Sequence, residues 1–389
     1  MDEIRIAVVG LGTRGAFNWI PLMQRVGGYR IVAICDSIEA VHARALGRVE
    51  EPGDVKAYTN YEDVLADKNV DAIGLTVRCQ DQGAMAAQGM AAGKHVNMEV
   101  PGAHTLEDCW KIVVAQEKSG LVFQLAEQCR YAGYIEEWKR MVGAGELGQV
   151  TLVEGQYFHY YVEKAFIDRK TGAMYGPTEI AAHPEAEPGW IYDMPPIHYL
   201  PHDLGPMLKV LDDRVTEVVG MSTDSPSTAH PELKSPDMQV ALMKTEKGAI
   251  VRMAASFAQP HPHVNNHWQQ VIGTKGSVEW NRTMRDRPKM WLHGAQMHDK
   301  AEVDWRHQRT DAPAGASGSG HADMDYYVHA AFRDAVLGKR PLEYDVYKAM
   351  DTTAPAVLAG DSIDQDGKKL RVPDFRPGEG RAKGEMPKG

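Results

Sequence analysis

Three glycines near the amino terminus have the spacing of a phosphate-binding loop. Gly10, Gly12 and Gly15 form the pattern Gly-x-Gly-x-x-Gly between an apolar, β-branched run at residues 4–9 and a stretch of helical periodicity. Glycines in this setting let the backbone approach a pyrophosphate at the amino end of the helix. The pattern therefore predicts a dinucleotide site. The alternative is a turn that is glycine-rich by coincidence.

An acidic residue after the next apolar run indicates which dinucleotide binds. Asp36 follows residues 31–35. A carboxylate at this place accepts hydrogen bonds from the adenine-ribose hydroxyls and repels a 2′-phosphate. Ser37 comes next and no arginine stands beside it, so the sequence favours NAD over NADP.

A second segment, residues 93–101, reads Gly-Lys-His-Val-Asn-Met-Glu-Val-Pro. Together with the glycine loop and the second half of the chain, it resembles the Gfo/Idh/MocA family of sugar and cyclitol oxidoreductases over nearly the whole chain. In most members this segment ends in Glu-Lys-Pro, and the lysine contacts the hydroxyl that is oxidised. Val100 stands at the lysine position here and cannot move a proton.

Another motif of that family is altered as well. Ordinary members carry an Asp and a His four residues apart at the start of a helix, one helical turn, so that both face the nicotinamide. In the matching stretch, residues 201–206, His202 stands in place of the Asp and Pro206 in place of the His. The usual set of Lys, Asp and His is therefore absent.

One branch of the family shows both departures. Three stretches, at residues 105–110, 127–131 and 199–206, are similar to the NAD-dependent glycosidases of glycoside hydrolase family 109, the α-N-acetylgalactosaminidases. The first reads Thr-Leu-Glu-Asp-Cys-Trp and the second Glu-Gln-Cys-Arg-Tyr. The third, Tyr-Leu-Pro-His-Asp-Leu-Gly-Pro, is close to the Tyr-Pro-Thr-His-Gly-Leu-Gly-Pro of that branch.

The resemblance assigns roles to individual residues. It implies that Glu127, Tyr157 and His202 are catalytic residues that line the reacting sugar, and that Tyr199 binds substrate beside the nicotinamide. Each has a structural alternative: Glu127 as a helix cap or arginine partner, Tyr157 as a core residue. For His202 the alternative is a structural hydrogen bond, and for Tyr199 it is loop packing. The residues expected to bind NAD are Gly10, Gly12, Thr13, Arg14, Gly15, Asp36, Thr76, Glu99, Val100, Pro101 and Gln128.

The resemblance also implies a reaction. The sugar C3 hydroxyl is oxidised, the C2 proton is removed, the C1 substituent is eliminated, water adds, and the ketone is reduced again. Tyr157, with a lowered pKa, is the expected C2 base, His202 exchanges the C3 hydroxyl proton, and Glu127 orients or polarises one of them. Two alternatives stay open. One is a conventional NAD-dependent sugar dehydrogenase or 3-keto-sugar reductase, and the other is a non-catalytic NAD-binding sensor.

Several positions depart from the glycosidase branch. Trp280 replaces a tyrosine expected after Gly276, and residues 77–82 replace a Trp-x-Trp-His stretch. The sugar-binding arm, residues 163–197, does not match, and its expected arginine has no counterpart that can be placed. The resemblance therefore leaves the sugar and its anomer open.

The predicted elements that position these residues are alternating strands and helices in the first part of the chain and mainly consecutive strands in the second. Strands and helices alternate up to residue 126, which predicts an α/β Rossmann domain at 1–126 with a parallel, doubly wound sheet. Beyond it, one helix at 133–143 precedes consecutive strands, so residues 127–389 are predicted to form an α+β domain with an open, mostly antiparallel sheet. The predicted strands of this part are 150–161, 215–222, 238–244, 249–256 and 268–278. A helical region is predicted at 322–337.

Composition excludes several classes of partner. A net charge of −10 without a basic cluster argues against nucleic acid and an acidic membrane surface, and no apolar run is long enough to span a membrane. Four isolated cysteines indicate a reduced, cytoplasmic protein rather than a disulfide framework. His261, His263 and His267 are the nearest approach to a metal site, but no carboxylate has matching spacing, so no metal is predicted. On family analogy we expect a homodimer or homotetramer that acts on a small sugar or glycoside.

Overall fold

The computed structural model describes residues 3–260 and 265–387. Its amino-terminal part is a six-stranded sheet in which every strand pair is parallel. The strands are β1 (Ile4–Val9), β2 (Tyr29–Cys35), β3 (Lys56–Tyr58), β4 (Ala72–Leu75), β5 (His95–Met98) and β6 (Phe123–Leu125). Their order, β3-β2-β1-β4-β5-β6, is that of a Rossmann fold, as predicted.

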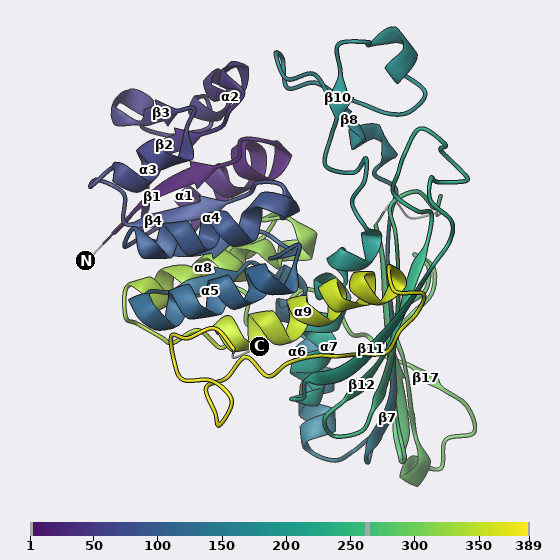
Figure 1. The fold of residues 1–389 in the computed structure, drawn as a ribbon. Coiled ribbons are helices and arrows are strands. Elements are labelled where there is room, and N and C mark those ends of the chain that lie inside the picture. Colours follow the sequence, from purple (N-terminus) through teal and green to yellow (C-terminus); the bar gives the residue numbers. More distant parts are fainter. Residues whose placement is uncertain (1–2, 261–264, 388–389) are drawn as a thin grey trace.

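Helices cover both faces of this sheet (Figure 1). Those between its strands are α1 (Ile20–Val26), α2 (His42–Leu46), α3 (Tyr61–Ala66), α4 (Cys79–Ala91) and α5 (Leu106–Ser119). The predicted first helix differs from the structure, because its opening turns, Thr13–Trp19, are π-helical. Such wide turns are rare and recur at functional sites.

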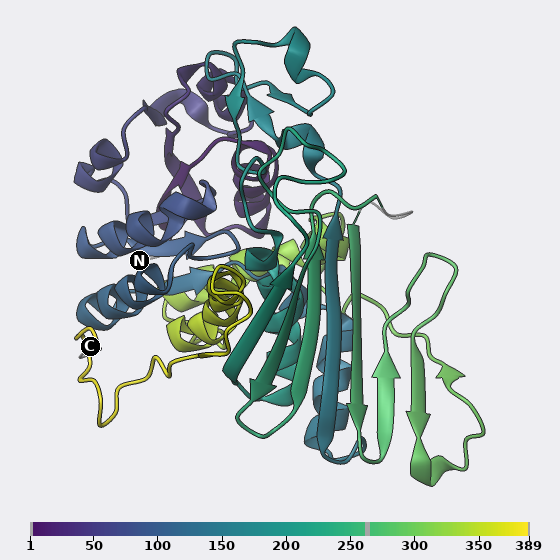
Figure 2. The same ribbon diagram turned by 45° about the vertical axis from the view of Figure 1, so that its right-hand side comes forward.

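The second sheet has nine strands and is antiparallel except between β7 and β13, which pair in parallel. Its strands are β7 (Val150–His159), β11 (Val215–Ser222), β12 (Gln239–Thr245), β13 (Ile250–Ser256), β14 (Asn265–Gly273), β15 (Gly276–Glu279), β16 (Lys289–Leu292), β17 (Ala301–Glu302) and β18 (Leu370–Arg371). The predicted single strand at 268–278 is wrong, because a tight turn after Gly273 divides it into β14 and β15. Figure 2 shows these strands as one broad sheet.

Three helices pack on one face of the second sheet: α6 (Gly133–Gly143), α7 (Pro201–Leu211) and α9 (Val346–Ile363). On this sheet Met221, Leu242 and Ile250 are exposed. The arm, residues 163–197, carries a small sheet of β8 (Phe166–Ile167), β9 (Met174–Tyr175) and β10 (Glu187–Pro188). The predicted homo-oligomer stays a prediction.

The chain returns to the first domain near its carboxyl end. Helix α8 (Asp325–Val336) packs beside α1, the phenol of Tyr29 donates to the carbonyl of His329, and the amide of Gln124 donates to that of Val328. Strand β6 ends at Leu125, next to the predicted boundary at 126, and the division into two domains stays a prediction. No described helix is long and apolar enough to cross a membrane.

Candidate active site

The glycine loop leaves no space for side chains on its inner side. Gly10 has φ of +90°, and a Cβ there would lie 2.6 Å from the carbonyl oxygen of Thr76. A Cβ on Gly15 would lie 1.9 Å from the carbonyl oxygen of Gly10. Nothing described lies within 4 Å of the corresponding point on Gly12, which faces open space. This cradle fits a dinucleotide phosphate, as the sequence predicts.

A cavity of about 390 Å³ opens beside the loop, with Asp36 at its wall. The two carboxylate oxygens accept hydrogen bonds from the amides of Leu11 and Ile38 at 2.7 and 2.9 Å. A carboxylate has about four acceptor sites, so capacity is left for ribose hydroxyls. The carboxylate is thereby fixed where the adenine ribose of NAD is expected.

A second cavity of about 350 Å³ continues from the first, and Gly12, Thr76, Arg78 and Trp190 line both. Of the residues expected to bind cofactor or substrate, those in its lining are Gly12, Thr13, Arg14, Thr76, Glu99, Val100, Gln128, Tyr157, Tyr199 and His202. The structure therefore gathers most of the predicted site around one hollow.

Three of the expected site residues are absent from the described linings of both cavities. Gly15 packs against Gly10 inside the loop. The carbonyl of Pro101 accepts a hydrogen bond from Thr353 at 3.1 Å, and the Val100–Pro101 peptide is cis. Glu127 is buried behind His202. These residues support the site from behind its surface.

Arg14 and Glu99 contact each other at the rim of the second cavity. The guanidinium of Arg14 lies 3.0 Å from Glu99 and 3.0 Å from Asp325, and the indole of Trp19 donates to the same Glu99 oxygen. Burial opposes the charge on Arg14, but the two carboxylates outweigh it and raise its pKa. The pair is thus held rigid before any ligand binds.

A buried histidine–carboxylate pair joins the two halves of the chain. Nδ1 of His202, in the first turn of α7, lies 2.7 Å from a carboxylate oxygen of Glu127, which follows β6. The other oxygen of Glu127 accepts from the amide of Cys129. Burial alone would lower the pKa of His202, but Glu127 raises it above its ordinary 6.5. His202 is therefore a group that takes up a proton readily.

Tyr157 lies in a stack of rings over this pair. Its ring stands 5.2 Å from that of His202 and 5.9 Å from that of Tyr199, with the planes nearly parallel. Burial raises the pKa of the phenol well above 10, and Tyr161 and Tyr199 raise it further. The expected lowering of this pKa is therefore wrong for the protein's own environment, because no described cation offsets the burial.

A second histidine chain lies on the same face and was missed by sequence reasoning. The Nε2 atoms of His159 and His267 are 3.1 Å apart, and Nδ1 of His267 lies 3.2 Å from the buried carboxylate of Asp203. The ring of His159 stacks on Tyr157 at 4.2 Å. Alternation along β7 places 157 and 159 on one face, which was a usable signal. That His267 of β14 lies beside His159 follows from the register of the β14–β7 pairing, which the sequence did not show.

Two cations of the cavity wall were also missed. Lys164, at the start of the arm, and Arg78, before α4, line both cavities. Burial lowers the pKa of Lys164, although Glu163 opposes this shift. The guanidinium of Arg78 reaches the carbonyl of Gly189 in the arm. Among the described residues that line these two cavities, Lys164 is the only lysine.

Two further sequence hypotheses concern Trp280 and the three histidines His261, His263 and His267. Trp280 does not line either cavity among the described residues; it stacks on Tyr134 at 3.9 Å in the core. His261 and His263 lie outside the described residues, and His267 contacts Asp203.

Two family models match the sequence and show the family to which the chain belongs. Residues 4–127 match the model of the oxidoreductase family with an NAD-binding Rossmann fold. Residues 137–381, more than half of the chain, match the carboxyl-terminal domain of glycosyl hydrolase 109. The chain belongs to glycosyl hydrolase family 109. Its cofactor is NAD, and it is an enzyme of a family whose named members act on sugars.

Individual family 109 relatives are similar over nearly the full length. A glycosyl hydrolase family 109 protein of Streptomyces niveus is 29% identical over 97% of this chain and 78% of the relative. An α-N-acetylgalactosaminidase of Bacteroides fragilis is 27% identical over 97% of this chain and 93% of the relative. The structure of scyllo-inositol dehydrogenase from Lactobacillus casei, with NAD(H) and scyllo-inositol, has a TM-score of 0.67 at 16% identity and covers 95% of this chain and 99% of its own. At this sequence identity, the structural similarity shows a shared fold only.

Proposed function

We propose that this family 109 protein cleaves a glycosidic bond through transient oxidation at C3 of the sugar, elimination across C2 and C1, addition of water, and reduction of the ketone. The observation that carries the proposal is the His202–Glu127 pair at 2.7 Å. His202 lines a cavity in which Val100 stands at the usual lysine position, and Glu127 lies buried behind it. A conventional dehydrogenase places its proton-moving lysine at that position. Here a buried imidazole with a raised pKa is the group beside the cofactor cavity.

The cofactor-binding residues are those of the two cavities, with Asp36 for the ribose and the loop at Gly12 for the phosphates. Bound NAD supplies reversible hydride exchange at the sugar carbon, so that no net oxidation results. The chain's own residues handle the protons. With Nδ1 held by Glu127, Nε2 of His202 is the nitrogen left to exchange a proton with the C3 hydroxyl.

Tyr157 is proposed as the base for the C2 proton. It lines the cavity between His202 and Tyr199, and a ketone at C3 makes the neighbouring C–H bond acidic. Because burial raises its pKa, the phenol needs help to release its own proton. The positive charge of an oxidised nicotinamide would offer that help, because a nearby cation favours the ionised phenol. Asp203, at the end of the histidine chain, acts in the opposite direction and raises the pKa of Tyr157.

One observation favours a second candidate, a conventional sugar dehydrogenase or 3-keto-sugar reductase. Lys164 reaches the same cavity from the arm, and burial lowers its pKa, so a lysine is available for proton transfer after all. A sensor without catalysis fits less well, because ionisable groups line the cavity on several sides. The α-N-acetylgalactosaminidase activity named for the Bacteroides fragilis relative makes an N-acetylhexosaminide one substrate to test.

The test of the proposed function is cofactor balance. Aryl glycosides should release their aglycone in the presence of bound NAD only, with no net change in NADH absorbance over many turnovers. Stoichiometric accumulation of NADH with the glycosidic bond intact would establish the dehydrogenase instead.

A further inference from the structure

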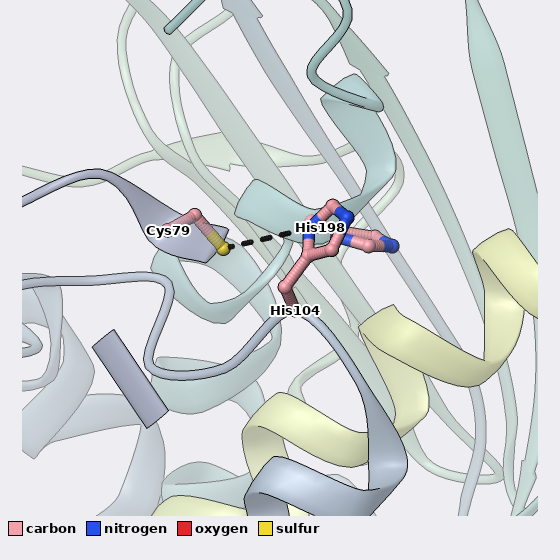
Figure 3. A group of neighbouring side chains, drawn as sticks. All are labelled: Cys79, His104 and His198. Atoms are coloured by element: carbon pink, nitrogen blue, oxygen red, sulfur yellow. Dashed lines mark hydrogen bonds between the residues drawn. The ribbon is translucent and has the colours of Figure 1, made fainter. Parts of the chain in front are cut away.

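Three side chains of the kinds that bind transition metals lie together beside the active-site cavity. Cys79 begins α4, His104 lies in the loop before α5, and His198 belongs to the short 3-10 helix Pro196–Tyr199. One ligand atom from each lies within 4.8 Å of the other two. Figure 3 shows the thiol and the two rings converging from three separate segments. A thiolate with two imidazoles is a donor set that zinc favours.

The distances suit one small ion. Sγ of Cys79 is 3.9 Å from Nδ1 of His104, and it also donates to the carbonyl of Ala103 at 3.4 Å. The rings of His104 and His198 are 4.9 Å apart, with planes inclined at 66°. A tetrahedral zinc ion, with Zn–S of about 2.3 Å and Zn–N of about 2.0–2.1 Å, holds sulfur and nitrogen roughly 3.5 Å apart. Closing the set around an ion therefore needs only a small adjustment.

His198 supplies the independent observation. The residue is 5% exposed, and among the described residues nothing forms a hydrogen bond with its Nδ1. A Cβ on Gly360 of α9 would lie 2.7 Å from Nε2, so that nitrogen faces α9, and Nδ1 is the ring nitrogen without a partner. A buried polar atom without a partner is costly.

We propose that Cys79, His104 and His198 bind one zinc ion, with water as the fourth ligand. On binding, the thiol proton of Cys79 is released to solvent, a zinc–sulfur bond forms, and both imidazoles coordinate as neutral rings. The site ties the segment that carries Tyr199 into the cavity to the start of α4. The sequence predicts no metal, because the three ligands come from separate segments and form no recognisable spacing.

A second group, Glu127, Cys129 and His202, also has ligand atoms within 4.8 Å of one another. There Glu127 and His202 already contact each other at 2.7 Å, and Glu127 also accepts from the amide of Cys129. An ion would have to break that pair. The cluster at Cys79, where no such pair has to be broken, is therefore the favoured site.

The test measures metal binding by the full chain with its NAD, without turnover, so it is independent of glycoside cleavage. The protein is dialysed against a chelator and titrated with Co²⁺, a spectroscopic substitute for zinc. We expect one equivalent to bind with a thiolate-to-cobalt absorption band in the near ultraviolet. The band should disappear in Cys79→Ser, and zinc should raise the Tm of the unmodified protein but not of this variant.

Two matched variants keep the result interpretable. Cys109→Ala removes another buried thiol and should retain the band. His104→Gln, at a half-buried position, should weaken binding by at least about tenfold even where Cys79→Ser fails to fold. Absence of the band in the unmodified protein overturns the proposal. So does a band that survives in Cys79→Ser but disappears in Cys129→Ser.

Discussion

His202 and Glu127 come from different halves of the chain, and Nδ1 of the histidine lies 2.7 Å from a carboxylate oxygen of the glutamate. The glutamate side chain is 0% and the histidine side chain 8% exposed, so the contact is shielded from water and salt. Of the two, His202 lines the cavity that Val100 also lines, and Glu127 lies buried behind it. The proposed chemistry depends on this pair.

Glu127→Gln should lower kcat/KM by about a hundredfold, within the range that positioned acid–base groups contribute. The amide keeps the size of the side chain but removes the charge that raises the pKa of His202. The pH profile of kcat/KM should therefore move its His202 limb to lower pH. Glu50→Gln, on an exposed side chain, is the control and should leave the profile in place. An unmoved profile in Glu127→Gln would contradict the assigned role.

The same pair makes stability depend on pH with a definite sign. Because the pKa of His202 is raised above 6.5 in the folded state, its stabilising contribution is complete below 6.5 and is lost as pH rises through the folded-state pKa. The free energy of unfolding of the unmodified protein should exceed that of Glu127→Gln most at pH below 6.5, and the gap should narrow above it. Urea denaturation at several pH values measures this. A gap that widens with rising pH would show the opposite linkage.

Removing His267 should destabilise the fold. In His267→Gln the buried carboxylate of Asp203 loses its histidine partner, while Gln269 still donates to it. Burial already raises the pKa of Asp203, and His267 opposes that rise. The expected loss is about 1–3 kcal/mol in the free energy of unfolding. His298→Gln, on an exposed side chain, is the control. Equal stability of the two variants would show that the chain from His159 to Asp203 contributes nothing to the free energy of unfolding.

Cofactor choice should depend on Asp36. In Asp36→Asn the hydrogen bonds from Leu11 and Ile38 can partly persist, but the charge that repels a 2′-phosphate is gone. We expect the preference for NAD over NADP to fall by at least about tenfold, or roughly 1.4 kcal/mol, mainly through tighter NADP binding. Titration of both cofactors by fluorescence gives the ratio. Equal affinities in the unmodified protein would contradict the account.

Introducing at Val100 the lysine of most Gfo/Idh/MocA members should not improve the enzyme. Val100 is 2% exposed, so Val100→Lys places an amine in a buried wall, next in sequence to Glu99, which is in contact with Arg14. The activity on the best glycoside should fall or stay level, and Val100→Ile controls for size. A large gain would indicate a conventional dehydrogenase with an impaired site.

The parts of the site that were predicted depend on short stretches of sequence. The spacing of Gly10, Gly12 and Gly15, followed by Asp36, specifies a local loop, and the structure has it. His202 and Glu127 were identified through motifs of about six residues. Neither motif showed that these two side chains, 75 residues apart in the sequence, contact each other.

The parts that were missed depend on tertiary register. His267 meets His159 only because β14 pairs with β7, and Trp280 stacks on Tyr134 although its place in the sequence suggested a site residue. Helix α9 was not predicted, since it is buried on nearly all sides, contains Pro355, and carries polar residues on its buried faces as well, so that its sequence has no clear amphipathic pattern. Such a helix is recognised by its burial between layers rather than by periodicity.

The most direct measurement of the central claim follows the C2 hydrogen during cleavage. Aryl glycosides of several sugars, an N-acetylgalactosaminide among them, are incubated with the purified enzyme in deuterated water without added NAD. Aglycone release should be accompanied by deuterium at C2 of the released sugar, with no change in NADH, and both should be lost together in a His202→Gln variant. Cleavage without deuterium at C2 would contradict the elimination step and, with it, the proposed function.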